Sequence, residues 1–246
     1  MSRRPSHRGP APEDAELFAP RMLPRLREAV GDLCWLLDRG YALVSSAELV
    51  GNRYTLTARQ RMAVNRSVCA EADQVRRHEH EVQPDALRGQ ELWLDGFNVL
   101  TVVEAALAGG VILRGRDGCL RDIASVHARH HEVEETQPAL HLLGTWLSGW
   151  GVVRARWWLD RPVSNSGRLK RRMLEVAAAN GWAWDVELVF NPDKVLAEST
   201  EIITTADSVI LDRCRRWVNV AWHAIARGVP GARLVDLSEE PAGDQA

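Results

Sequence analysis

The fold is decided by the stretch Glu91-Leu-Trp-Leu-Asp-Gly-Phe-Asn-Val-Leu100. Leu92–Leu94 is a short apolar run that ends abruptly at Asp95-Gly96, a turn dipeptide carrying a carboxylate. Asn98 can then cap a helix. The apolar residues after it recur at helical spacing, and the helix is expected to end at Gly109-Gly110. In an open α/β sheet, ligands bind beyond the carboxyl ends of the strands, so an acid placed there suits chemistry. One such Asp is more often a turn former or a helix cap, so a functional interpretation requires the pattern to recur.

The composition is that of an ordinary globular protein, with 46% hydrophobic and 26% charged residues in a chain of 246. No apolar run approaches the roughly 20 residues of a membrane span, and the basic N-terminus lacks the apolar segment of a secretory signal. The four cysteines lie far apart, which is typical of reduced thiols. We therefore expect a cytoplasmic protein without a membrane segment. The net charge of −2 does not by itself indicate a nucleic-acid binder.

Residues 1–86 are predicted to form a small, Arg-rich, all-helical unit, with residues 1–12 disordered. Its expected helices are Asp14–Asp38, Ser45–Val50 and one that begins at Thr57. Thr57 and Gln60 have the spacing of a capping box. The apolar residues that such a unit leaves exposed make it a candidate homodimer surface.

From residue 90 to residue 237, short apolar runs alternate with helical patterns. The expected strands are Leu92–Leu94, Val111–Leu113, Val153–Leu159, Asp185–Phe190, Glu201–Thr204 and Arg233–Leu237. The expected helices are Asn98–Ala108, Leu120–His131, Gln137–Trp150, Ser164–Asn180, Ala206–Arg213 and Trp217–Arg227. This alternation predicts an α/β fold, a three-layer sandwich with a central, mostly parallel sheet covered on both faces. The tail 238–246 is expected to be loose and acidic.

Four of the expected strands are followed closely by an aspartate: Asp95, Asp160, Asp193 and Asp207. Asp212 follows about one helical turn after the last of these. At one edge of a parallel sheet these carboxylates would repel one another unless protons or cations neutralise them. Mg²⁺ or Mn²⁺, which bind carboxylate oxygens and keep waters for a substrate phosphate, satisfy that need. The alternative is that each acid is a cap or a turn former.

A basic segment follows Asp160. Its proposed phosphate-binding residues are Ser164, Asn165, Ser166, Arg168 and Lys170. The first three lie at an expected helix start, where free N–H groups and the helix dipole favour an anion. The segment would hold a nucleic-acid backbone, or it is simply a capped helix with a solvated basic face.

Other acidic and histidine residues are weaker candidates for the metal shell. They are Glu104, Asp117 and Asp122, each of which is more simply a surface acid, and the His-rich runs at His78–His80 and His127–Glu132, which are most simply solvated faces. The chain lacks a nucleophile elbow, a phosphate-binding P-loop and a dinucleotide-binding glycine motif.

Two segments resemble the NYN branch of the PIN-like nucleases. Leu94-Asp-Gly-Phe-Asn-Val-Leu100 is similar to the opening motif of that group, and Ile203-Thr-Thr-Ala-Asp-Ser-Val-Ile210 to its later Thr/Ser-Asp strand. The chain as a whole, from Arg8-Gly-Pro-Ala-Pro-Glu-Asp14 to Pro162-Val-Ser-Asn-Ser-Gly-Arg168, is similar to an uncharacterised prokaryotic domain-of-unknown-function family.

The nuclease resemblance implies a metal-dependent ribonuclease fold over residues 90–237. Asp95 matches its first metal acid, Asn98 the motif partner and Asp207 the late acid, while Asp160 lies where some relatives keep an acid. The mid-chain Glu of that group has no clear match.

We therefore expect hydrolysis of RNA phosphodiesters, with Asp95, Asn98, Asp160 and Asp207 as catalytic residues. Asp95, Asp160 and Asp207, helped by Asp212 or Asp193, would hold Mg²⁺ or Mn²⁺, which activates a water. The alternatives are a non-catalytic module of the same fold that binds RNA or a protein, and, third, a phosphatase acting on small phosphoesters.

Overall fold

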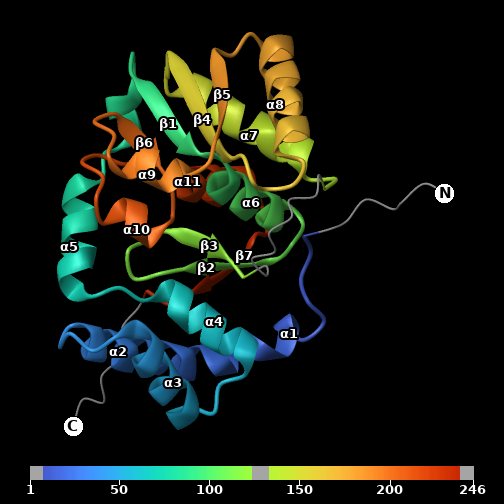
Figure 1. The fold of residues 1–246 in the computed structure, drawn as a ribbon. Helices are drawn as coiled ribbons and strands as arrows, with labels where there is room; N and C mark the ends of the chain where they lie inside the picture. Colours follow the sequence, from blue (N-terminus) through green and yellow to red (C-terminus); the bar gives the residue numbers. More distant parts are fainter. Residues whose placement is uncertain (1–7, 124–132, 239–246) are drawn as a thin grey trace.

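The computed structural model describes residues 8–123 and 133–238. It contains two β-sheets with helices packed around them, and a helical N-terminal region (Figure 1). The mixed α/β fold with a mostly parallel central sheet and an N-terminal helical region confirms the coarse prediction from sequence.

The strands are short. They are β1 (Glu91–Asp95), β2 (Val111–Arg114), β3 (Leu120–Asp122), β4 (Arg154–Asp160), β5 (Trp184–Val189), β6 (Ile202–Thr204) and β7 (Arg233–Asp236). The N-terminal helices are α1 (Asp14–Leu17), α2 (Leu23–Leu37), α3 (Leu43–Arg53), α4 (Ala58–Ser67) and α5 (Glu71–His80), with 3₁₀ turns at Pro20–Met22 and Pro84–Leu87. The later helices are α6 (Gly96–Leu107), α7 (Thr136–Gly149), α8 (Ser166–Asn180), α9 (Pro192–Ala197), α10 (Ser208–Leu211) and α11 (Val220–Gly228).

The larger sheet has the strand order β5-β4-β1-β6, and all of its pairs are parallel. Along the chain, β4 adds to one side of β1 and β5 adds outside β4. The chain then returns, and β6 pairs with the other side of β1. The direction of strand addition therefore reverses between β1 and β6, which makes this gap the topological switch point of the sheet.

Alternation along the strands gives the larger sheet two different faces. Leu92, Leu94 and Trp157 belong to the main core with apolar residues of α6, α7, α8 and α11. Trp93 and Trp158 point the other way, with ring centroids 4.9 Å apart, and pack on the small cluster formed by α9 and α10. Because helices contact both faces, this part of the chain has three layers.

The smaller sheet, of order β3-β2-β7, lies between the core of the larger sheet and the N-terminal helices. Ile112 and Leu120 join the main core, whereas Val111, Leu113 and Val235 pack against α2 and α4. Figure 1 shows α2 and α3 at the end of the molecule opposite the four-stranded sheet. The sequence predicted a single sheet, and the short strands alone do not reveal that β2 and β7 pair separately.

Some expected elements differ in the structure. Leu120–His131 was expected to be a helix, but Leu120–Asp122 is strand β3, because Gly118, at φ +74°, turns the chain back to pair with β2. The rest of that segment, with its histidines, lies outside the described residues. Helix α9 was not expected, although Asn191 caps it by accepting a hydrogen bond from the Lys194 N–H.

In the N-terminal region, the expected helix Asp14–Asp38 is divided, with a 3₁₀ turn beginning at Pro20. The Thr57–Gln60 capping box is confirmed. Arg8, from the segment expected to be disordered, forms an ion pair with the buried carboxylate of Glu104. Among the described residues, no helix is long and apolar enough to cross a membrane.

Candidate functional site

The four strand-end aspartates, Asp95, Asp160, Asp193 and Asp207, lie at the same edge of the larger sheet, which we call the acidic edge. Asp95 ends β1 and Asp160 ends β4, while Asp193 and Asp207 lie in the first turn and at the N-cap of the helices that follow β5 and β6. Because the four strands are parallel neighbours, their carboxyl ends meet at one edge. Asp95 and Asp207 flank the switch point, which is the position where open α/β sheets bind ligands.

Asp95 and the segment after β6 are joined by a short hydrogen-bonded chain. The hydroxyl of Thr205 donates to Asp95 Oδ2 at 2.7 Å and accepts from the backbone N–H of Asp207 at 2.9 Å. Asp207 Oδ1 in turn accepts from the N–H groups of Val209 and Ile210, which caps α10. These bonds use one carboxylate oxygen of each acid and leave the other oxygen out of them.

Asn98 holds the same segment from a different element. The prediction that Asn98 caps the helix is wrong, because α6 begins at Gly96 and Asn98 lies within its first turn. There its Oδ1 accepts a hydrogen bond of 2.8 Å from the N–H of Ala206, while Arg121 Nε donates to the Ala206 carbonyl at 2.8 Å. Both polar groups of Ala206, the residue between Thr205 and Asp207, are therefore held by side chains.

Arg121 is itself held by a buried ionic cluster. Its guanidinium donates to both oxygens of Asp117, at 2.9 and 2.6 Å, and Arg77 of α5 donates to Asp117 at 2.6 Å. Burial alone would raise the pKa of Asp117, but Arg121 and Arg77 lower it to about 2. Asp117 therefore acts as the anion of this cluster and is not a member of the acidic site.

The strand-end acids are close enough to affect one another's ionisation. Burial raises the pKa of Asp95 to about 7, with smaller contributions from the charges of Asp207 and Asp193, while the Thr205 hydrogen bond opposes the rise. Burial and the charge of Asp193 raise the pKa of Asp160, and partial burial and Asp207 raise that of Asp193. Asp95 is 6% exposed and Asp193 is exposed, so the site opens from a buried acid toward solvent.

The other candidate acids have partners elsewhere. Asp212 accepts from Arg76 at 3.0 Å and from Arg77 at 2.8 Å, so it belongs to the ionic cluster beneath α5. Glu104 binds Arg8 and the Thr136 hydroxyl, and Asp122 binds Arg66. Within the described residues, no three His, Cys, Asp or Glu side chains are arranged as a ready-made metal site.

The predicted phosphate-binding segment lies at the same edge, at the start of α8. Asn165 precedes the helix at φ +67°, and the buried Ser166 hydroxyl donates to the Arg161 carbonyl at 3.3 Å. Ser164 and Arg168 are exposed. Lys170 lies 3.8 Å from Glu187, so its charge is partly compensated. Ser166 is thus used within the protein, whereas Ser164 and Arg168 face solvent.

Sequence reasoning missed Arg121 and Phe190 as residues of this region. Arg121 lies in a stretch that was expected to be helical, and no sequence signal linked it to Ala206. Phe190 was visible only as the end of a strand, yet it is an exposed aromatic that directly follows β5, three residues before Asp193.

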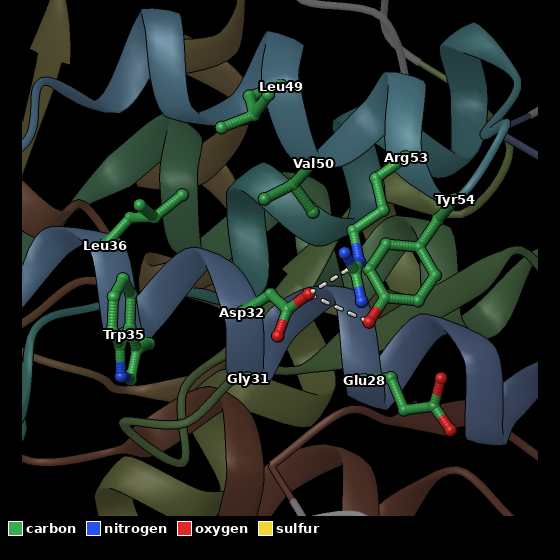
Figure 2. Close-up of a pocket in the computed structure, with 9 residues that line it drawn as sticks. All are labelled: Glu28, Gly31, Asp32, Trp35, Leu36, Leu49, Val50, Arg53 and Tyr54. Carbon is green, nitrogen blue, oxygen red and sulfur yellow. Dashed lines mark hydrogen bonds and ion pairs between the residues drawn. The ribbon is translucent and has the colours of Figure 1, made fainter.

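A separate groove lies between α2 and α3, away from the acidic edge (Figure 2). Trp35, Leu36 and Leu49 form its apolar side, and at the other side Asp32 accepts from the Tyr54 hydroxyl at 2.9 Å and pairs with Arg53. It lies on the N-terminal helical unit that was predicted to mediate dimer formation.

The fold and the site define an open α/β protein with aspartates at the ends of four parallel strands. The chain belongs to the family described as "Domain of unknown function (DUF5616)", whose model matches residues 84–223. A second model, "Protein of unknown function (DUF434)", matches residues 25–80. The chain is 28% identical over 186 residues to "Uncharacterized protein MJ0935" of Methanocaldococcus jannaschii, which covers 76% of this chain and 88% of that protein. No solved structure matches the chain.

These matches confirm the predicted membership of a domain-of-unknown-function family. The similarity to PIN-like nucleases stays a prediction.

Proposed function

We propose that this protein is a metal-dependent nuclease of PIN-like fold that hydrolyses RNA phosphodiesters at the acidic edge. The observation that carries the proposal is that Asp95, Asp160, Asp193 and Asp207 lie at the carboxyl ends of four parallel strands, where neighbouring acids help to raise the pKa of the first three. A purely structural set of caps does not require four acids to lie at one edge of a sheet, two of them beside its switch point, where their mutual repulsion has a cost.

The residues present suit Mg²⁺ or Mn²⁺. The Thr205 bond to Asp95 and the capping bonds to Asp207 each use one oxygen of the carboxylate, and a hard divalent cation needs only one or two protein carboxylates when waters and a substrate phosphate complete its shell. Asp160 and the exposed Asp193 are the further acids of this set. When bound, such an ion supplies Lewis-acid activation of water and neutralises charge on the phosphate.

The chain's own residues have distinct roles in this proposal. Thr205 orients Asp95, and Asn98 fixes the segment that carries Thr205 and Asp207, which makes Asn98 a positioning residue. Arg161 and Lys194, each next to an acid in sequence, place positive charge where the phosphate backbone would run. Ser164 and Arg168 extend this surface at the start of α8.

The test is RNA cleavage by Asp95→Asn and Asp207→Asn beside the native protein. We expect native cleavage that needs Mn²⁺ or Mg²⁺ and disappears with chelator, and a loss of at least about 100-fold in both variants, because a metal-bound site depends on its acids. Thermal unfolding of the variants would show that the fold persists. Undiminished cleavage by Asp95→Asn would remove the assignment.

A non-catalytic binding module is the second candidate. It is favoured by one observation, that no three potential ligands among the described residues form a ready-made metal site. This alternative expects RNA or protein binding without turnover, unchanged by divalent metal. Calorimetric titration of Mn²⁺ in the presence of RNA separates the two functions, since only the nuclease should bind metal in a way that Asp95→Asn abolishes.

A further inference from the structure

Phe190 is an exposed aromatic side chain in an unusual setting. It follows β5, is 73% exposed, and has the guanidinium carbon of Arg161 at 5.1 Å from its ring centroid. A single exposed apolar side chain needs no explanation by itself. Here the ring is stacked with a cation that comes from the neighbouring strand end.

The pair is fixed beside the acidic edge by the backbone. Asp160 pairs with Val189 in the register of β4 and β5, and the next residue, Arg161, donates its N–H to the Val189 carbonyl at 2.7 Å. Phe190 therefore follows the residue paired with Asp160 and precedes Asp193 by three positions. Consecutive Cα atoms are about 3.8 Å apart, so the Cα atom of Phe190 lies within about 11 Å of that of Asp193.

Arg161 and Lys194, the cations beside Asp160 and Asp193, have no acidic partner in the part of the chain that the structure describes. By contrast, Lys170 and Arg172 on α8 both lie near glutamates. An exposed ring beside uncompensated positive charge is the combination that binds single-stranded nucleic acid, in which bases stack on aromatic rings and cations follow the backbone.

We propose that Phe190 and Arg161 form a stacking subsite for one unpaired base of the substrate, next to the acidic edge. The inference rests on the proposed function, because it takes RNA as the ligand of this edge. The base covers the open face of the Phe190 ring, and Arg161 binds the adjoining phosphate. A base inside a duplex is stacked on its neighbours and cannot enter this subsite, so Phe190 favours unpaired over paired strands.

The experiment measures binding of a fluorescein-labelled 12-nucleotide RNA by anisotropy, as a single strand and as a duplex, in Mg²⁺. All proteins carry Asp95→Asn so that the RNA stays intact. Phe190→Ala removes the ring but keeps Arg161, and Phe190→Trp keeps a stacking surface. The matched control is Trp35→Ala, because Trp35 is also exposed (53%) and is stacked by Arg39 at 3.5 Å, but on α2.

We expect Phe190→Ala to weaken single-strand binding about tenfold or more, the usual effect of losing one base-stacking ring, while Phe190→Trp and Trp35→Ala bind normally. Duplex binding should not change. Equal single-strand affinity of Phe190→Ala and its parent would overturn the inference, and so would an equal loss for duplex RNA.

Failure of the two proposals is distinguishable. RNA cleavage by protein with native Asp95, together with an unaffected Phe190→Ala, would refute only the stacking subsite. Absence of both RNA binding and cleavage in the native protein would refute the proposed function and the subsite together. Altered self-association of Phe190→Ala in sedimentation, without a change in RNA affinity, would assign Phe190 to a protein interface and overturn the subsite.

Discussion

At the scale of single residues, the acidic edge depends on one carboxylate held in an unfavourable state. Asp95 is nearly excluded from water, and its hydrogen bonds from the Thr205 hydroxyl and the Asn98 backbone do not offset the effect of burial on its pKa. A pKa of about 7 means that protons and cations compete for this group near neutral pH. Such a shift is typical of functional acids, although structural networks also produce it.

Asp95 should make the protein less stable as pH rises through a defined window. Its pKa is about 4 in an unfolded chain and about 7 in the fold, so between these values the folded state retains a proton that the unfolded state has lost. The free energy of unfolding therefore falls from pH 4 to pH 7 on account of this group and levels off above. Asp95→Asn should remove this loss and raise the melting temperature at pH 8 by several degrees, about 2–4 °C per kcal/mol.

The control for this prediction is Asp185→Asn. Asp185 lies at the amino end of the same sheet and pairs with Arg154 at the surface. Calorimetric melting at pH 5 and pH 8 measures both variants. A melting temperature for Asp95→Asn that stays below the native value at pH 8 would contradict the prediction.

Asn98 should contribute to stability through the one bond that it makes to Ala206. Asn98→Ala leaves the buried Ala206 N–H without its acceptor, which costs about 1–3 kcal/mol. Urea unfolding should show a lower midpoint with an unchanged slope. Thr101→Ala is the matched control in the same helix, since Thr101 bonds only to carbonyls of its own turn. Equal stability of the two variants would show that the Ala206 segment does not depend on Asn98.

At the scale of elements, the turn from β1 into α6 needs a residue without a side chain. A Cβ on Gly96 would lie 2.5 Å from Leu159 Cδ2 and 2.9 Å from the Trp158 carbonyl oxygen. Leu159 is fully buried, and the carbonyl belongs to the strand paired with β1, so neither moves freely. The Asp-Gly dipeptide thus serves packing as much as turn formation.

Gly96→Ala should therefore destabilise the protein by about 1–3 kcal/mol, the usual cost of forcing extra atoms into a packed core. Gly167→Ala is the opposite control: Gly167 lies in the first turn of α8 with nothing within 4 Å of the added carbon. That change should be neutral or stabilising by up to about 1 kcal/mol, because Ala favours helix. Similar melting temperatures for the two variants would refute this account of Gly96.

Sequence predicted the elements whose signals are local. The runs that became β1, β4 and β5 are short, apolar and bounded by turn residues, and the strand-end acids follow from their boundaries. The pairing of β2 with β7 depends on contacts between residues more than a hundred positions apart, and β3 depends on the turn at Gly118. Local periodicity carries no information about such pairing, so the second sheet and the role of Arg121 were not predictable from it.

At the scale of the whole molecule, the N-terminal region is built into the rest of the fold. Arg77 of α5 forms ion pairs with Asp117 and Asp212. The backbone of Trp217 forms isolated β-bridges with Glu81 and with Ile203 of β6. The Trp217 ring N–H also donates to the Arg77 carbonyl at 2.6 Å. Arg77 also binds Asp117, Asp117 binds Arg121, and Arg121 donates to the carbonyl of Ala206, the residue before Asp207. The two family matches therefore describe parts of one physical unit.

This arrangement predicts a single cooperative unfolding transition. Leu33 of α2 is fully buried in the core that the N-terminal helices share with β2 and β7, so Leu33→Ala should cost about 2–5 kcal/mol. If the core is shared, the loss of stability affects the N-terminal helices and the larger sheet together. Calorimetry should show one transition lowered by roughly 5–15 °C, and hydrogen exchange of the β1 amides should accelerate along with those of α2.

Leu49→Ala is the matched control, because Leu49 of α3 is 61% exposed and its truncation removes little buried surface. It should leave both the transition and the β1 exchange rates nearly unchanged. Two separate transitions in Leu33→Ala, with the β1 amides still protected while α2 exchanges, would mean that the helices unfold alone. In that case the shared apolar core would not couple the N-terminal helices to the larger sheet, and their unfolding would be independent of it.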